Sequence, residues 1–203
     1  EFNVSLRTIR EKYQYNIGFS VQPQQSTTSY EQGTIKVDTT RNVVNFSPTF
    51  DYRYRFNKQS MLRINYRGRT SQPSMTDLLP ITDTSDPLNI SKGNPSLKPS
   101  YTNSFMLFYN TFLPEKQQSM MARLTFSNTI NSVSNTVTYD EETGARITQP
   151  KNINGNWSAS GGFVFNTPLK NKKFTVSTFS DGSYNNMVGF TSLSRQTYSQ
   201  KNT

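Results

Sequence analysis

The sequence contains no cysteine and no histidine. Without cysteine there is no disulfide framework, no zinc ribbon and no thiol nucleophile. Without histidine the chain lacks the commonest metal ligand and the side chain that titrates nearest neutral pH. Long apolar runs are missing too: the longest spans five residues, Phe105 to Tyr109, whereas a membrane-spanning helix needs roughly 20. These absences exclude much metal, redox and acid–base chemistry.

Aromatic residues are abundant although hydrophobic residues are few. Only 32% of the residues are hydrophobic, yet 13% are aromatic, with 14 Phe, 11 Tyr and one Trp. A disordered chain of such low hydrophobicity would be poor in aromatics. The net charge of +9 comes from 22 Lys and Arg against 13 Asp and Glu. The composition therefore indicates an ordered fold that does not depend on a large dry core.

Apolar and polar residues alternate along most of the chain. Between residues 13 and 21 the odd positions are apolar, and between 44 and 56 the even positions are. Alternation of this length predicts β-strands with one apolar and one polar face. In the predicted strand at residues 120–139 the apolar phase changes near Asn131, which indicates a bulge or a change of environment. We expect about seven long strands, at residues 13–21, 44–56, 62–67, 101–112, 120–139, 147–166 and 174–188.

The connections between these strands alternate between short and long. Short polar connections lie at residues 57–59, 113–118 and 167–173, and long ones at residues 23–41 and 71–100. A compact turn is expected at residues 140–144, and one helical turn at residues 76–79. Such connections predict an all-β, antiparallel up-and-down meander with the short turns at one end. The apolar face of the sheet either packs on a second sheet, as in a soluble β-sandwich, or meets lipid, as in a transmembrane β-barrel.

Strand length and the position of the aromatics favour the barrel. Several of these strands, at roughly 13 to 20 residues, exceed the usual five or six of soluble sheets. The aromatics gather toward strand ends, as expected of girdles at the two membrane interfaces. The residues concerned are Tyr52, Tyr54, Phe56, Phe108, Tyr109, Phe112, Phe163 and Phe165.

Five arginines share the polar phase of two adjacent predicted strands: Arg53, Arg55, Arg63, Arg67 and Arg69. Basic residues interleaved with aromatics can follow a nucleic-acid backbone. Here the arginines and the aromatics point to opposite faces, which argues against a nucleic-acid partner. We interpret the arginines as candidate lumen-facing residues. They either pair with acids on a plug or a neighbouring strand, or attract an anionic solute.

The acidic residues offer no spaced catalytic pair. Asp77, Asp83 and Asp86 lie close together in one loop, but their spacing matches no established calcium motif, and loop aspartates usually form turns. We predict no enzymatic activity, no cofactor and no metal site.

Residues 63–109 carry a series of short motifs. Tyr66 and Arg69 precede Gln-Pro-Ser at 72–74, and Asp-Pro-Leu follows at 86–88. The most specific motif consists of Gly93, Asn94, Pro95, Ser96, Leu97, Lys98 and Pro99. Together these motifs resemble the barrel of TonB-dependent receptors, in particular the outer-membrane β-barrel family abundant in Bacteroidota. The family's usual Glu after Lys-Pro is Ser100 here. Because proline cannot donate to a β-ladder, we expect the chain to re-enter the sheet only after Pro99.

The resemblance implies a segment of a larger transmembrane barrel of the 22-strand type in the bacterial outer membrane. Its long loops would face outward and its short turns the periplasm. The implied function is solute or nutrient import. The implied partners are outer-membrane lipid, a plug domain, an inner-membrane energising complex and a surface lipoprotein. We expect residues 1–203 to form one partial barrel region without a plug domain and with two exposed sheet edges. The alternative is a soluble surface β-sandwich that binds carbohydrate or protein.

Overall fold

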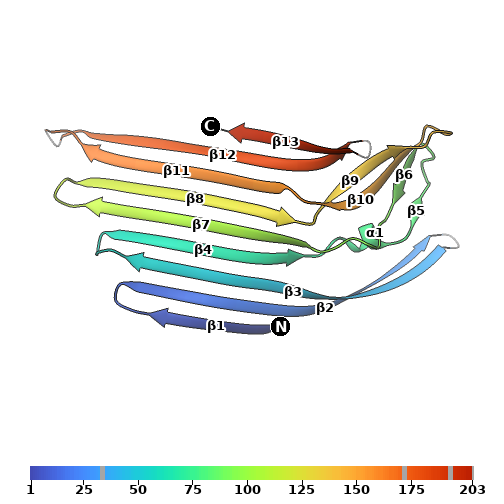
Figure 1. Cartoon of the computed structure of the whole chain (residues 1–203), viewed down its shortest axis with the longest axis horizontal. Helices are drawn as coiled ribbons and strands as arrows, with labels where there is room; N and C mark the ends of the chain where they lie inside the picture. The colour runs from blue at the N-terminus through green and yellow to red at the C-terminus, as the bar shows by residue number, and fades with distance from the viewer. Residues whose placement is uncertain (33–34, 171–172, 192–193, 203) are drawn as a thin grey trace.

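The computed structural model describes residues 1–32, 35–170, 173–191 and 194–202. Within these residues nine strands form one antiparallel sheet, which we call the main sheet. In spatial order, which is also chain order, they are β1 (Phe2–Ile9), β2 (Tyr13–Gln32), β3 (Ile35–Arg55), β4 (Ser60–Ser71), β7 (Ser100–Leu113), β8 (Gln118–Ile130), β11 (Asn156–Pro168), β12 (Thr175–Thr191) and β13 (Ser194–Asn202). The predicted antiparallel meander is confirmed (Figure 1).

A second, smaller sheet lies beyond one end of the main sheet. Its strands, in spatial order, are β5 (Thr82–Asp83), β6 (Asn89–Lys92), β10 (Arg146–Ile153) and β9 (Ser132–Tyr139). The helix α1 (Met75–Leu78) precedes them and begins at Ser74, whose side chain accepts a hydrogen bond from the Asp77 N–H. This confirms the predicted helical turn. We call residues 72–99 and 132–153 together the cap. The cap lies at the right of Figure 1.

The prediction of seven long strands was too low. It missed β1, although Phe2, Val4 and Leu6 alternate there with polar residues. It also missed β13, whose sequence SRQTYSQKN has almost no apolar residues. An edge strand with few apolar side chains shows little alternation of apolar and polar residues, so the sequence pattern does not reveal it.

The predicted long connection at residues 23–41 was wrong. β2 and β3 continue through it as one extended hairpin, and their pairing reaches from Tyr13 and Tyr54 to Gln32 and Ile35. Polar pairs hold this outer part together. The hydroxyls of Thr27 and Thr40 lie 3.2 Å apart. A polar ladder of this kind lacks the apolar alternation on which the prediction depended.

The change of phase near Asn131 marks the point where the chain leaves the main sheet. Of the two predicted explanations, a bulge or a change of environment, the second is confirmed. β8 ends at Ile130, and β9 begins at Ser132 in the small sheet. Asn131 between them has a positive φ of 54°, a conformation that asparagine tolerates better than most residues. The predicted strand at 147–166 divides in the same way, into β10 and β11, with Gly155 at a φ of 116°.

Four connections between main-sheet strands lie at the end opposite the cap (Figure 1). They join β1 to β2, β3 to β4, β7 to β8 and β11 to β12. The compact turn predicted at residues 140–144 joins β9 to β10, with a hydrogen bond from the Gly144 N–H to the Asp140 carbonyl. Among the described residues, no helix has the length and apolarity needed to cross a bilayer.

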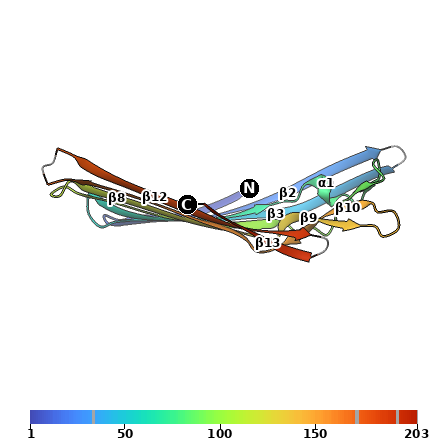
Figure 2. The ribbon, with the colours of Figure 1, turned by 90° about the horizontal axis from the view of Figure 1, so that it is seen from above.

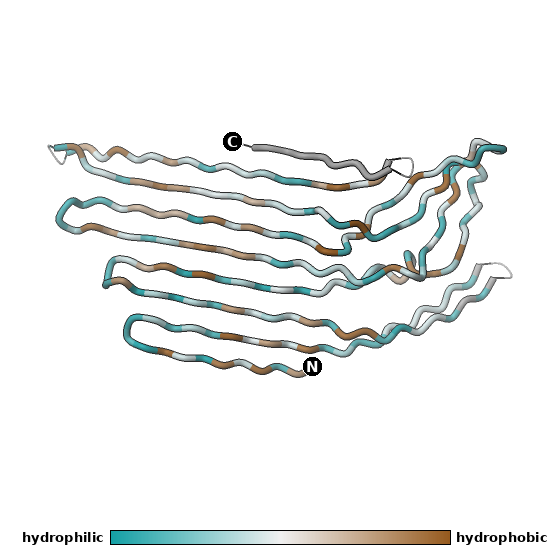
Figure 3. The backbone as a smooth tube through the Cα atoms, viewed as in Figure 1, coloured by the Kyte–Doolittle hydropathy of each residue, from teal (hydrophilic) through white to brown (hydrophobic). Residues whose placement is uncertain are grey.

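The main sheet is a single curved layer, as seen in Figure 2. Apolar residues recur along its strands (Figure 3), and many remain exposed, such as Leu124 at 57% and Phe126 at 42%. The buried hydrophobic residues lie mostly in the cap: Leu78, Leu79, Leu97, Ala145 and Ile153. Within the described residues no second sheet covers the apolar side of the main sheet, so the β-sandwich alternative gains no support.

Candidate functional site

Strand pairing gives the main sheet two chemically different faces. Cross-strand neighbours share a face, and Tyr15, Tyr52 and Ile64 are such neighbours on β2, β3 and β4. We call this side the apolar face. The alternate residues, such as Gln14 and Arg53, form the polar face.

A row of aromatic rings crosses five neighbouring strands on the apolar face. Tyr66 on β4 lies 4.7 Å from Phe105 on β7, measured between ring centroids. The row continues to Phe126 on β8 at 6.4 Å, to Trp157 on β11 at 6.1 Å and to Tyr184 on β12 at 5.0 Å. These separations lie in the range in which aromatic pairs attract one another. The row therefore forms a continuous band near the cap end of the sheet.

Not all predicted girdle residues lie on the apolar face. Phe163 and Phe165 do, with ring centroids 6.5 Å apart. Phe108 lies on the polar face, because its cross-strand neighbours are Arg63 and Arg123. Alternation places Phe112 on that face as well. Clustering along the sequence was a poor guide here, since consecutive strand residues point to opposite sides.

The structure brings the five predicted arginines together on the polar face, where we call them the arginine column. Arg53 on β3 lies directly opposite Arg63 on β4. The Arg63 Nε and Nη2 atoms donate to the Asp51 Oδ2 atom at 3.0 and 2.6 Å. Arg55, Arg67 and Arg69 are exposed. A lumen-facing position for these side chains stays a prediction.

A hollow of about 500 Å³ opens on the polar face of β1 to β4. Arg63 and Arg67 of the column line it, together with Asp51. Arg7 on β1 is a further lining residue that the sequence interpretation missed, because it did not recognise β1 as a strand. Alternation along residues 2–8 was the signal that could have found it. The other lining residues are polar: Ser5, Gln14, Asn16, Thr49 and Asn65.

The motif at residues 93–99 connects the two parts of the cap. The Gln149 side-chain amide donates to the Gly93 carbonyl at 3.1 Å, and the Asn94 side chain donates to the Pro150 carbonyl at 2.8 Å. The Lys98 N–H donates to the Asn152 side chain at 2.8 Å. Leu97 is 2% exposed in the core of the cap.

The motif also leads into the main sheet as expected. Arg41 on β3 donates from Nη2 to the Leu97 carbonyl at 3.1 Å. β7 begins at Ser100, directly after Pro99, which confirms the predicted point of re-entry. Pro95 lies within the same connecting segment, between β6 and β7. The motif therefore fixes the cap to the start of β7 and to β3.

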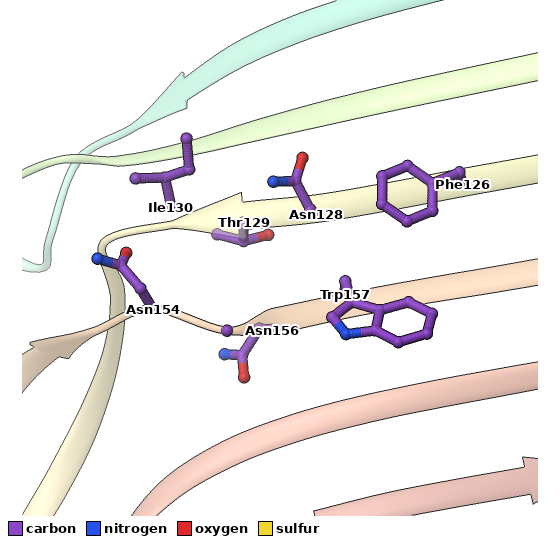
Figure 4. Close-up of a pocket in the computed structure, with 8 residues that line it drawn as sticks. Phe126, Asn128, Thr129, Ile130, Asn154, Asn156 and Trp157 are labelled. Carbon is purple, nitrogen blue, oxygen red and sulfur yellow. The ribbon is translucent and has the colours of Figure 1, made fainter. Parts of the chain in front are cut away.

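A second hollow, of about 440 Å³, lies where β8 and β11 leave the main sheet (Figure 4). Phe126 and Trp157 form its apolar side. Asparagines line it at the point where β8 passes into β9 and β10 into β11. Asn154 accepts a hydrogen bond from the Asn131 N–H at 2.6 Å, and Asn156 accepts one from the Val188 N–H at 2.7 Å. These two amides therefore fix the segments that join the main sheet to the cap.

The acidic residues of the cap form turns. Asp83 accepts a hydrogen bond from the Ser85 N–H, and Asp86 accepts bonds from the Leu88 N–H and the Asn89 side chain. These bonds lower the pKa of both carboxyl groups below the ordinary value. In the part of the chain that the structure describes, no three acidic residues come together as a metal site would require.

The family to which the chain belongs is shown by comparison with known proteins. The model of the outer membrane protein beta-barrel family matches residues 4–203, nearly the whole chain. No curated protein matches the chain. The two-faced antiparallel sheet, with four short connections at one end and the cap beyond the other, agrees with the architecture of such barrels. The chain belongs to the outer membrane protein beta-barrel family, whose place is the bacterial outer membrane.

Proposed function

We propose that this chain forms part of the wall and the external loops of a TonB-dependent receptor that imports a nutrient solute. The observation that carries the proposal is the division of the main sheet into an aromatic face and an arginine face. In a transmembrane barrel the outward side is apolar with aromatic girdles, whereas the interior is polar. We assign the apolar face to outer-membrane lipid and the polar face to the barrel interior.

The difference between the two ends of the sheet supports one orientation of the barrel wall in the outer membrane. Barrels of the outer membrane have short periplasmic turns and longer extracellular loops. We therefore assign the four connections opposite the cap to the periplasm and the cap to the outside. A rigid cap suits recognition of a solute, because loops held on a scaffold commonly carry binding residues.

A receptor of this kind needs partners besides the barrel wall. Import requires a plug within the barrel and an energising complex in the inner membrane, and a surface lipoprotein is a further candidate partner. In this proposal the chain binds and guides a solute and performs no chemistry on it. The 22-strand barrel is the architecture we infer for the whole receptor.

The assignment of faces can be tested with nitroxide labels. Since these 203 residues contain no cysteine, Leu124→Cys and Thr125→Cys each place a single thiol in them, on opposite faces of β8, and any cysteine elsewhere in the full-length protein is first replaced by serine. In the full-length protein reconstituted in lipid vesicles, we expect the label at 124 to collide mainly with oxygen, which concentrates in lipid. The label at 125 should collide mainly with a water-soluble nickel complex. Glu142→Cys in the cap turn is the aqueous control.

The opposite accessibility pattern would exclude a barrel wall with the assigned faces. A chain that is monomeric and folds cooperatively without lipid or detergent would support the β-sandwich instead.

The import step needs a separate measurement. Cells that express the full reading frame should take up the solute only while the inner-membrane energising complex is intact. A protonophore, which removes the proton gradient, should stop uptake as well. Uptake that continues at an unchanged rate in both conditions would refute a TonB-dependent receptor and indicate a passive pore.

A further inference from the structure

We propose that the arginine column is a path for a small, negatively charged solute that carries carboxylate or phosphate groups. This inference rests on the proposed function, because it requires the polar face to line the barrel interior. It adds a class of substrate to that function. Four observations carry it: the extent of the column, its uncompensated charge, an unpaired guanidinium nitrogen and the adjoining hollow.

The column extends along most of β4. Arg55 pairs with Met61 across the β3–β4 ladder, and Arg69 lies at the other end of β4. From position 61 to position 69 there are eight steps, or about 26 Å at roughly 3.3 Å per residue. A strand tilt of about 40° leaves about 20 Å along the membrane normal, close to the roughly 25 Å of the apolar band. Guanidinium groups therefore follow one another across most of the membrane.

Few acidic side chains lie near the arginine column to balance its positive charge. Among the acids of β1 to β4, Asp51 lies beside the column, whereas Glu31 and Asp38 lie in the outer hairpin of β2 and β3. Asp51 forms an ion pair with Arg63 at 2.6 Å. Within the described residues the other column arginines have no ion-pair partner. Asp51 is therefore the carboxylate that pairs with the column in the described residues, and Glu11 of the β1–β2 connection lines a small hollow beside Arg53 and Arg55 without an ion pair to either.

The pairing of Arg53 with Arg63 favours an anion beside these two side chains. Like charges directly opposite one another destabilise a strand pair. In addition, the Arg53 Nε atom is buried and has no hydrogen-bond partner among the described residues, which costs free energy relative to a satisfied donor. A carboxylate or phosphate beside these two side chains would reduce the repulsion and accept the free N–H.

The hollow on β1 to β4 has the volume of a small-molecule site. Its volume of about 500 Å³ lies within the range of roughly 300–1,000 Å³ that is usual for such sites. Arg7 and Arg67 lie on its wall with guanidinium groups that match the two oxygens of a carboxylate or phosphate. Amides and hydroxyls of the same wall can bind uncharged oxygens. A small organic anion fits this combination of size and chemistry.

The test uses the full-length protein in detergent micelles at low salt, with citrate and inorganic phosphate as probes. Equilibrium dialysis with radiolabelled probes measures binding. We expect Arg67→Gln and Arg7→Gln each to weaken citrate binding by about tenfold or more, since each removes a charged hydrogen-bond donor. Both side chains are exposed, so both variants should fold. Arg146→Gln, which removes an equally exposed arginine from the cap, should leave binding unchanged.

A second variant should strengthen binding. Asp51→Asn removes the carboxylate that holds Arg63 and keeps a side chain of the same shape. We expect citrate to bind more tightly to this variant, because Arg63 becomes available to it. A site that merely holds the sheet together would lose binding, or show none, after the same change.

Two outcomes would overturn the proposal. One is citrate binding that is no tighter than the binding of a neutral sugar of similar size. The other is the absence of citrate binding. If Arg67 then also resists modification by phenylglyoxal, acids of the plug occupy the hollow. Neither outcome affects the proposed function. If the nitroxide labels instead place the polar face in lipid, the proposed function itself fails.

Discussion

Gly93 shows how one residue of the motif controls the shape of the cap. A Cβ atom at this position would lie 1.9 Å from the Leu79 carbonyl oxygen and 3.2 Å from the Asp77 carbonyl oxygen. Both neighbours are backbone atoms, which cannot rotate away as the end of a side chain can. The segment after β6 can therefore pack against the end of α1 only if residue 93 has no side chain.

We predict that Gly93→Ala destabilises the reconstituted protein by about 1–3 kcal/mol, the usual cost of overpacking. Guanidinium unfolding in lipid vesicles measures the free energy of unfolding. Gly162→Ala is the matched control, since its Cβ would meet no atom closer than 3.9 Å. That control should change stability by less than about 0.5 kcal/mol. Equal effects of the two substitutions would contradict the role of the close approach at residue 93.

Asp140 makes the turn between β9 and β10 sensitive to acid. Its carboxylate accepts hydrogen bonds from the Thr143 N–H, the Thr143 hydroxyl and the Glu142 N–H. The bonds from Thr143, with a smaller contribution from the bond of Glu142, lower the pKa of Asp140 below the ordinary value of 3.8. Because the folded pKa is the lower one, stabilisation of the turn is complete above 3.8 and is lost as pH falls through the lowered value.

We therefore predict that a nitroxide at Glu142→Cys becomes more mobile only below pH 3.8, as Asp140 takes up a proton. The line width of its electron paramagnetic resonance spectrum, followed from pH 6 to pH 2, measures this mobility. In the Asp140→Asn background the amide oxygen still accepts hydrogen bonds but does not titrate. The mobility there should not depend on pH. A transition of equal size in both backgrounds would assign the acid sensitivity to another group.

Sequence reasoning succeeded at residues whose role depends on their immediate neighbours. Alternation placed Arg53 and Tyr54 on opposite faces, and the change of phase marked Asn131. Sequence reasoning could not predict the close approach of Gly93 to the Leu79 carbonyl, because that contact depends on how the segment after β6 packs against the end of α1. It also could not find the ion pair of Asp51 with Arg63, since the register between two strands decides which side chains meet.

At the level of elements, the cap is held together by a few side chains that connect its two segments. Asn152 on β10 donates to the Lys98 carbonyl at 3.0 Å and to the Asn131 carbonyl at 2.9 Å, and accepts from the Lys98 N–H. It thereby connects the lead-in to β7, the end of β8 and the hairpin of β9 and β10. Its polar bonds add to the small apolar core around Leu97.

We predict that Asn152→Ala loosens both segments of the cap while the main sheet stays intact. The loss of three hydrogen bonds should cost about 1–3 kcal/mol. Hydrogen exchange followed by mass spectrometry should show faster exchange in residues 72–99 and 132–153 and no change in β7 or β8. Ser91→Ala, an exposed change on β6 of the same cap, should leave exchange unchanged. Faster exchange throughout the main sheet would mean that Asn152 supports the whole fold.

On the scale of the whole molecule, the chain exposes far more surface than a compact protein of its mass. A folded monomer of 23.2 kDa is expected to expose about 9,700 Å². This chain exposes 13,879 Å², because its main sheet is a single layer. In the barrel that we propose, lipid covers this excess on one face and further strands pair with the sheet edges. This explains how a chain with 32% hydrophobic residues can fold.

The edge of the main sheet at β1 should govern the behaviour of the 203-residue chain in water. Unpaired N–H and C=O groups on an edge strand recruit further strands. The Arg10 N–H donates to the Tyr13 carbonyl, and bonded and non-bonded pairs alternate in an antiparallel ladder. The N–H of Leu6 therefore points toward β2, whereas the N–H of Ser5 points away from it.

We predict that this chain associates in water without detergent, and that Ser5→Pro reduces the association. Proline at position 5 removes an outward donor and leaves the ladder with β2 intact. Leu6→Pro removes an inward donor instead, so it should separate β1 from β2, expose the edge of β2 and leave association at least as strong. Sedimentation velocity measures the distribution of sizes. If the two variants associate equally, the chains meet through the apolar face, where Phe2, Val4 and Leu6 of β1 lie, and the edge plays no part.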